Sequence, residues 1–238
     1  MIDRIMARIF SGILFLGILT STSAQNAMLK EADSLFLEQK YTQAIENYQD
    51  LYKNGMASPS MLLKMAFIQD GLGRHAEALY YLEKYYRMSA DRNVVTKIEE
   101  LSGNNDLQGY KYDDTDYFIN LINKYRPQLL ALFIALAILM LVYILRKTKE
   151  GEKPIAAPII QFIVICVILG LNNLEGSERA IIISDSTLLR SGPSAGAEPV
   201  DLIEKGHKVK VLEQDDVWTK IVWNGEEVYV RNGKLKLI

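Results

Sequence analysis

The sequence predicts a multidomain membrane protein of three parts: an all-α helical repeat, a hairpin of two transmembrane helices and a small all-β barrel. Three observations predict it. Residues 41–48 recur in pattern at residues 75–82, a spacing of 34 residues. Two apolar runs, Leu129–Leu145 and Ile155–Leu171, are each about as long as the roughly 17–25 residues that cross a bilayer as a helix. After Glu178 the apolar residues alternate with a period of two, as strands do.

The first segment, residues 1–24, is predicted to be a secretory signal. Arg4 and Arg8 give it a positive start, Ile9–Leu19 an apolar stretch, and small residues end it. The alternative is an uncleaved signal anchor. Either way, residues 25–128 are expected on the far side of the cytoplasmic membrane.

The apolar runs predict transmembrane helices at residues 128–146 and 155–172, joined by a loop at residues 147–154. Cations crowd this connection: Arg146, Lys147, Lys149 and Lys153. Because an excess of Lys and Arg marks the cytoplasmic side, the loop is expected inside. A hairpin returns the chain to its starting side, so both soluble parts are predicted on the periplasmic, extracytoplasmic face.

Charge and cysteine content exclude several classes. The formal net charge is −2, with nine Lys/Arg against eleven Asp/Glu in residues 25–102 and nine against ten in residues 176–238. Neither soluble part has the basic footprint that nucleic-acid binding needs. The one cysteine, Cys166, lies in the second apolar run, which leaves no intramolecular disulfide or cysteine metal cluster.

The repeat has a small residue, Ala44 or Ala78, between larger apolar ones. A small residue at this place lets two antiparallel helices cross closely, and with the 34-residue period it resembles the tetratricopeptide (TPR) family. It departs from the family where Glu31-Ala32 and Met65-Ala66 stand for the usual Leu-Gly pair. The resemblance implies a solenoid over residues 25–103.

Two repeats bury little surface, so a third element is expected. Apolar residues on one face predict a capping helix over residues 93–102, ended by Gly103. Residues 104–127 are predicted to be a juxtamembrane linker with a helix over residues 115–126. Pro127 then suits an early position of the first membrane helix.

The TPR resemblance implies a concave groove that binds a partner protein. Its candidate partner-binding residues are Asp33, Phe36, Phe67 and Asp70. The favoured alternative is that Phe36 and Phe67 are core residues.

The last part, residues 178–238, carries the strand pattern, and Asn224-Gly225 predicts a tight hairpin turn. Residues 188–194 (LLRSGPS), 205–212 (KGHKVKVL) and 218–221 (WTKI) resemble the bacterial SH3-like (SH3b) family. Leu188 replaces the family's usual Asn, which implies an altered ligand groove.

SH3-like domains bind short peptides or cell-wall peptides in aromatic-lined grooves. By this resemblance, Trp223 and Tyr229 are candidate partner-binding residues. Trp218 is expected in the core, and Arg190 is expected to brace its loop.

Nothing in the sequence predicts an enzyme, a cofactor or a metal site. The two histidines, His75 and His207, fall in different modules. The acidic run at Asp113, Asp114 and Asp116 lacks the glycine and terminal glutamate of a calcium loop. We therefore expect a non-enzymatic binding protein.

The order of parts resembles the BatE-type proteins of the Bacteroides aerotolerance (Bat) operon. The resemblance implies an envelope complex linked to oxygen or stress tolerance, with Bat proteins that carry von Willebrand A domains and a MoxR-type ATPase as partners. It implies a scaffold set in the lipid bilayer. The alternative is a sensor that binds peptidoglycan peptides.

Overall fold

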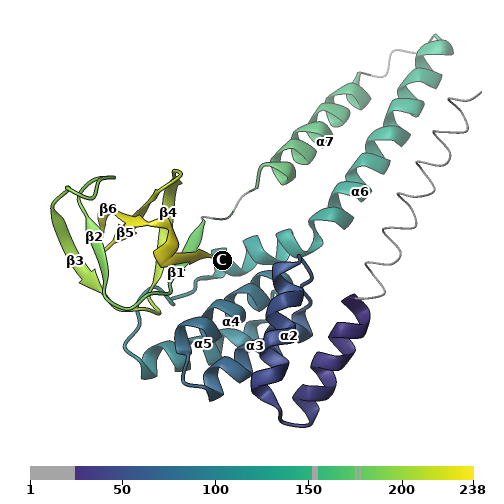
Figure 1. Cartoon of the computed structure of the whole chain (residues 1–238). Coiled ribbons are helices and arrows are strands. Elements are labelled where there is room, and N and C mark those ends of the chain that lie inside the picture. The colour runs from purple at the N-terminus through teal and green to yellow at the C-terminus, as the bar shows by residue number, and fades with distance from the viewer. Residues whose placement is uncertain (1–24, 152–154, 175, 177) are drawn as a thin grey trace, which may run out of the picture. The chain divides into compact units, whose positions relative to one another are not determined.

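The computed structural model describes residues 25–151, 155–174, 176 and 178–238. The predicted signal at residues 1–24 and part of the predicted cytoplasmic loop lie outside the described residues. The chain divides into two compact units, Met1–Leu82 and Glu83–Ile238, and Figure 1 shows their helices and strands.

The first unit is helical. A helix over residues 25–37 is followed by α2 (Tyr41–Lys53), α3 (Pro59–Gly71) and the start of α4 (His75–Ser89). Helices α2 and α4 start 34 residues apart, as the sequence pattern predicts. Alanines fill the helix crossings: Ala32, Ala44, Ala66 and Ala78 are all at most 2% exposed. Close backbone approach there explains why the pattern needs small residues.

A tyrosine cluster closes one side of this unit. The Tyr52 and Tyr80 hydroxyls lie 2.9 Å apart, and the ring of Tyr81 packs edge-on against both rings. Burial raises the pKa of Tyr81 to about 12. Burial, together with the hydrogen bond between the Tyr80 and Tyr52 hydroxyls, also raises the pKa of Tyr80.

Raising the pH above about 10 should therefore destabilise the first unit. These phenols have a higher pKa folded than unfolded, so their stabilisation is complete below the unfolded pKa near 10 and is lost as the pH rises toward 12. Ionisation of Tyr81 alone should lower the free energy of unfolding by about 2 kcal/mol at pH 12. Helical circular dichroism should fall together with the rise of phenolate absorbance. Unchanged helical circular dichroism between pH 10 and pH 12 would contradict this prediction.

The second unit opens with the end of α4 and with α5 (Arg92–Asn104). The Asp91 side chain caps α5 by accepting a hydrogen bond from the Asn93 N–H at 3.0 Å. The predicted apolar face is buried. The helix runs through Gly103, so the expected end there is wrong: a glycine in the last turn costs only about 1 kcal/mol and leaves α5 intact.

Helix α6 (Asp114–Lys149) is one continuous helix of 36 residues. It joins the predicted juxtamembrane helix to the first predicted span, and Pro127 lies inside it. The expectation that Pro127 stands near a helix start is therefore wrong. A proline removes one backbone hydrogen bond, and the remaining hydrogen bonds of this long helix continue through it.

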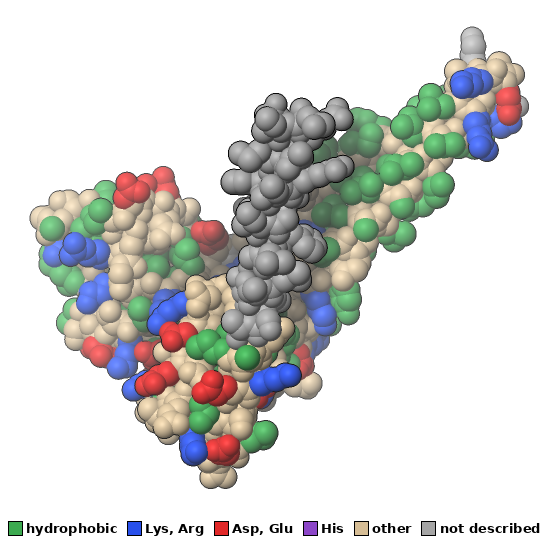
Figure 2. Space-filling model, turned by 45° about the vertical axis from the view of Figure 1, so that its right-hand side comes forward, with side chains coloured by type: hydrophobic (Ala, Val, Ile, Leu, Met, Phe, Trp, Pro, Cys, Tyr) green, Lys and Arg blue, Asp and Glu red, His purple; other side chains and the backbone are tan. Residues whose placement is uncertain are grey.

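Among the described helices, α6 is the one long and apolar enough to cross a membrane; α7 (Ala156–Asn172) is apolar but has 17 residues. The two helices lie side by side (Figure 1). Figure 2 shows hydrophobic side chains along them and Lys and Arg at their far end. Large apolar side chains on these helices are exposed, for example Leu139 (66% exposed) and Phe162 (67% exposed). The second span, and with it the hairpin, stays a prediction.

The rest of the second unit is an antiparallel sheet in the order β3-β2-β6-β5-β4-β1-β7, and it confirms the predicted all-β part. The strands are β1 (Arg179–Ile182), β2 (Thr187–Arg190), β3 (Pro199–Ile203), β4 (Lys208–Gln214), β5 (Trp218–Trp223), β6 (Glu226–Arg231) and β7 (Leu235–Leu237). Asn224 and Gly225 join β5 to β6 with φ of +52° and +85°. This double positive φ is the tight hairpin that the sequence predicts.

The predicted linker packs against this sheet. The Lys208 N–H donates to the Gln108 carbonyl and the Gln108 N–H donates to His207 Nδ1, both at 3.0 Å. The Tyr110 hydroxyl donates to the Gly206 carbonyl at 2.5 Å. Residues 107–112 therefore form part of the folded unit.

An ion pair lies beneath the linker. Lys208 Nζ is 2.6 Å from Glu83 Oε1, and both side chains are at most 5% exposed. The Tyr112 hydroxyl also donates to Glu83. At the base of α6, Asp116 pairs with Arg179 at 2.5 Å. These contacts tie the segments before and after the apolar helices into one unit.

Candidate functional site: a cationic groove around Trp218

Successive side chains of strand β5 alternate between the core and the outer face of the sheet. Thr219, Ile221 and Trp223 are buried, whereas Trp218 and Lys220 are only partly buried. Trp218 and Trp223 are an odd number of positions apart, so they must point to opposite faces. One tryptophan belongs to the core and the other to the outer face.

The core tryptophan is Trp223, which is 8% exposed. Its indole N–H donates to Asp201 Oδ2 at 2.7 Å, and its ring packs edge-on against His207 with centroids 5.1 Å apart. Trp223 is therefore not available to a partner, and the expectation of an exposed binding residue is wrong. The expectation of Trp218 in the core is also wrong, because Trp218 lies on the outer face of β5 and is only partly buried.

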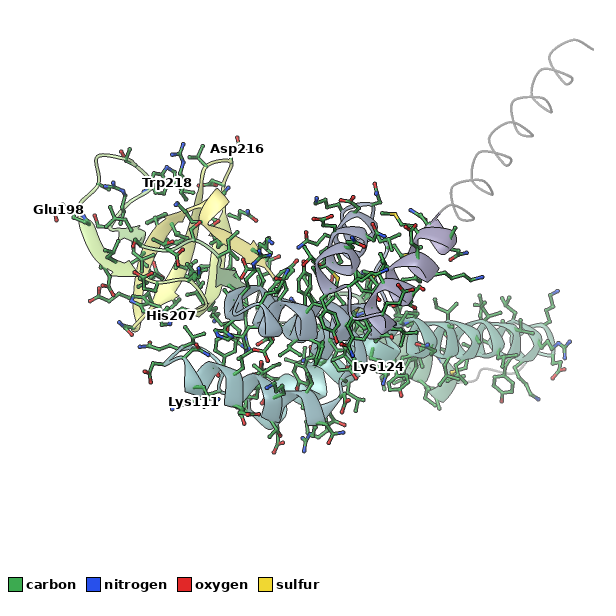
Figure 3. All side chains as sticks on the ribbon, turned by 60° about the horizontal axis from the view of Figure 1, so that its bottom comes forward. Lys111, Lys124, Glu198, His207, Asp216 and Trp218 are labelled. Atoms are coloured by element: carbon green, nitrogen blue, oxygen red, sulfur yellow. The ribbon has the colours of Figure 1, made fainter. Side chains whose placement is uncertain are left out.

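A groove of about 350 Å³ opens beside Trp218. We call it the Trp218 groove, and its lining is Ser186, Leu188, Arg190, Ala195, Val217, Trp218, Arg231 and Lys234. Trp218, Val217 and Leu188 form an apolar floor, with Val217 48% and Leu188 37% exposed. Figure 3 shows Trp218 near the loop that carries Asp216, at the opposite end of the sheet from His207.

Strand pairing fixes the polar side of this groove. Trp218 stands directly opposite Arg231, and Arg190 stands opposite Tyr229. Arg190 Nη1 donates to the Ala197 carbonyl at 2.7 Å, so Arg190 braces its loop as expected. Tyr229 is half-buried and lies on the same outer face, next to the groove lining.

The groove is positively charged. Three of its eight lining residues are cations and none is an acid. Acids do adjoin the lining: Asp185 and Asp216 precede Ser186 and Val217 in the chain, and the Glu204 carboxylate accepts hydrogen bonds from the Ser186 N–H and hydroxyl. Lys220 on the same face is already paired with Glu227 at 2.5 Å. The groove therefore offers an anionic ligand two arginines and a lysine around an aromatic floor.

The first unit has an aromatic cluster of its own, Phe36, Tyr41 and Phe67, with ring centroids 5.6–5.8 Å apart. Phe67 is 58% exposed, so the interpretation of Phe67 as a core residue is wrong. Phe36 is half-buried. We call these three residues the Phe67 patch.

The two acidic candidates of the first unit have other contacts. Asp33 accepts hydrogen bonds from Tyr48 at 2.6 Å and Lys64 at 2.7 Å. Burial raises the pKa of Asp33, but these bonds outweigh it and lower the pKa overall. Asp70 lies 3.2 Å from His75 Nδ1. Both carboxylates thus hold the helices together beside the Phe67 patch.

Histidines and acids elsewhere have structural partners. His207 accepts from the Gln108 N–H, and burial lowers its pKa, so it is neutral at pH 7. Asp113 caps α6 through the Asp116 N–H, and Asp114 pairs with Arg92. Within the described residues, no group of three or more His, Cys, Asp or Glu is placed to hold a metal ion.

Comparison with known proteins identifies one part of the chain. Residues 185–236 match the family model described as the bacterial SH3 domain. The match covers the Trp218 groove and leaves β1 and the linker outside it. Neither the curated proteins nor the solved structures gave a match. The TPR and BatE-type resemblances stay predictions.

Proposed function

We propose that this chain is a non-enzymatic, membrane-anchored scaffold that binds partners through the Trp218 groove and the Phe67 patch. The observation that carries the proposal is the open, aromatic and cationic groove in a part of the chain that matches a bacterial SH3 domain. Such domains are binding domains, and aromatic-lined grooves bind short peptide segments.

An anchor in the cytoplasmic membrane is part of this proposal. Helix α6 supports it by length and composition. The cations Arg146, Lys147 and Lys149 in its last turn suit the cytoplasmic side. With α7 as the returning span, the helical unit and the sheet share the extracytoplasmic face.

The finer assignment rests on resemblance. The 34-residue helix spacing and the buried alanines support two TPR repeats. The order of parts supports a BatE-type role in an envelope complex for aerotolerance or stress response. Bat proteins with von Willebrand A domains are then the expected partners.

The test is photo-crosslinking in native membranes followed by mass spectrometry. Trp218→Ala and Phe67→Ala should each remove a subset of crosslinked partners, because each removes the aromatic centre of one surface. Leu202→Ala is the matched control, since Leu202 is 58% exposed on β3 and outside the groove lining. An unchanged set of partners in both variants, at normal protein levels, would reject the scaffold.

A second candidate function is a sensor that binds peptidoglycan peptides, and the bacterial SH3 match favours it. The full-length protein in detergent should then be retained on purified peptidoglycan and released by Trp218→Ala. Flow-through of the wild-type protein would remove this candidate.

A further inference from the structure

We propose that the occupant of the Trp218 groove is an acidic peptide segment of a partner protein. Its carboxylates would bind Arg231 and Lys234, and an apolar side chain would lie on Trp218. This inference rests on the proposed scaffold function and names the chemistry of one of its partners.

Local charge is the first argument. Residues 176–238 hold ten Asp/Glu against nine Lys/Arg, so the sheet region is slightly acidic overall. The groove lining, by contrast, gathers three cations and no acid. A cationic groove in an acidic surround attracts a negative ligand and repels a positive one.

Availability is the second argument. Arg231 and Lys234 are exposed, and no ion pair among the described residues engages either side chain. Arg190, in contrast, uses one N–H on the Ala197 carbonyl. Arg231 therefore keeps its planar fork for a carboxylate, which it can bind through two parallel hydrogen bonds.

Shape is the third argument. A volume of about 350 Å³ lies at the low end of ligand pockets, which span roughly 300–1,000 Å³, so it suits a short segment. The apolar floor of Trp218, Val217 and Leu188 favours a ligand that places an apolar side chain beside its carboxylates. A peptide that alternates acidic and apolar side chains supplies both contacts from one extended chain.

The experiment uses full-length protein in detergent micelles and two synthetic probes. One is the pentapeptide acetyl-Ala-Glu-Leu-Glu-Ala-amide, and the other has Gln at both Glu positions. Binding is measured by calorimetry and by tryptophan emission, which Trp218→Phe should render unresponsive. The Glu peptide should bind about tenfold more tightly than the Gln peptide, and this margin should shrink at high salt.

The charge variant Arg231→Gln/Lys234→Gln should weaken the Glu peptide about tenfold and leave the Gln peptide unchanged. Arg231→Lys/Lys234→Arg keeps the charge and should restore most of the binding. Lys210→Gln is the matched control, because Lys210 is exposed on β4 and outside the lining. All three variants change exposed side chains, so normal unfolding curves verify the fold.

Equal affinity for the two peptides, or no effect of the charge variant, overturns the acidic-peptide proposal. The scaffold function would still stand if Trp218→Ala removes crosslinked partners. Two further probes test other occupants of the groove: soluble peptidoglycan fragments and vesicles of anionic lipid. Binding of either one that depends on Arg231 and Lys234, without binding of the Glu peptide, also overturns the proposal.

Discussion

Replacing Lys208 by methionine is expected to lower the free energy of unfolding of the unit Glu83–Ile238 by about 3–5 kcal/mol. Lys208 and Glu83 are both buried and lie 2.6 Å apart. The Lys208 ammonium also lies 4.1 Å from the centroid of the Tyr112 ring. Removing the cation leaves the Glu83 carboxylate buried without its counter-charge. Losing one partner of a buried pair costs far more than losing the pair together.

The measurement is denaturant unfolding of the full chain in detergent, followed by tryptophan emission. Lys210→Met on the same strand is the control, and it should change stability by less than about 0.5 kcal/mol because Lys210 is exposed. The double variant Glu83→Leu/Lys208→Met should recover most of the loss, since no buried charge remains. A Lys208→Met variant as stable as Lys210→Met would show that the pair is open to water.

Replacing Gly109 by alanine is expected to release residues 107–112 from the sheet, at a cost of about 2–4 kcal/mol. Gly109 has φ of +93°, and an added Cβ would collide with the Lys208 carbonyl. That carbonyl belongs to the backbone of β4, so a side-chain rotation cannot relieve the clash. Releasing the linker would also break the hydrogen bonds of Gln108 and Tyr110.

Hydrogen exchange of the Gln108 and Lys208 amides in the full chain measures this release. Both amides should exchange faster in Gly109→Ala. Gly103→Ala is the matched control: it lies in α5 with open space around its added Cβ, so it should leave these amides protected and stabilise the helix by about 0.5–1 kcal/mol. Unchanged protection in Gly109→Ala would contradict the observed linker packing.

The parts of the fold that could be predicted from sequence depend on local rules. The Asn224-Gly225 turn follows from two residues that tolerate positive φ, and the buried alanines of the helical unit follow from the 34-residue period. Each pattern is complete within one repeat or one hairpin. Their burial and backbone angles agree with the expectation.

The candidate site was harder to predict because family resemblance and strand parity point in opposite directions at β5. The resemblance puts Trp218 in the core. The alternation Thr219, Ile221, Trp223 puts it on the outer face, because these three residues face inward together. Parity alone, read from the polar Lys220 and the apolar Ile221, could have found the groove.

Other misses come from long-range packing. Glu83 and Lys208 read as ordinary surface charges in their own segments, and only the folded unit brings them together. The sequence places residues 104–112 in a juxtamembrane linker and predicts no contact of this segment with the sheet. Its contacts are with main-chain groups of Gly206 and Lys208, which leave no pattern in the sequence.

The buried ion pair also sets the order in which parts of the protein can fold during synthesis. Glu83 and Lys208 are 125 positions apart, so residues 83–112 cannot complete their packing until β4 has been synthesised. Helices α6 and α7 emerge from the ribosome before that moment. They form an insertion flanked by an ion pair, in which Arg179 Nη2 lies 2.5 Å from Asp116 Oδ1. Lengthening or shortening the apolar parts of these helices by whole turns should therefore leave the interrupted unit intact, because the ion pairs and hydrogen bonds that tie α6 to the rest of the unit lie at residues 114–126.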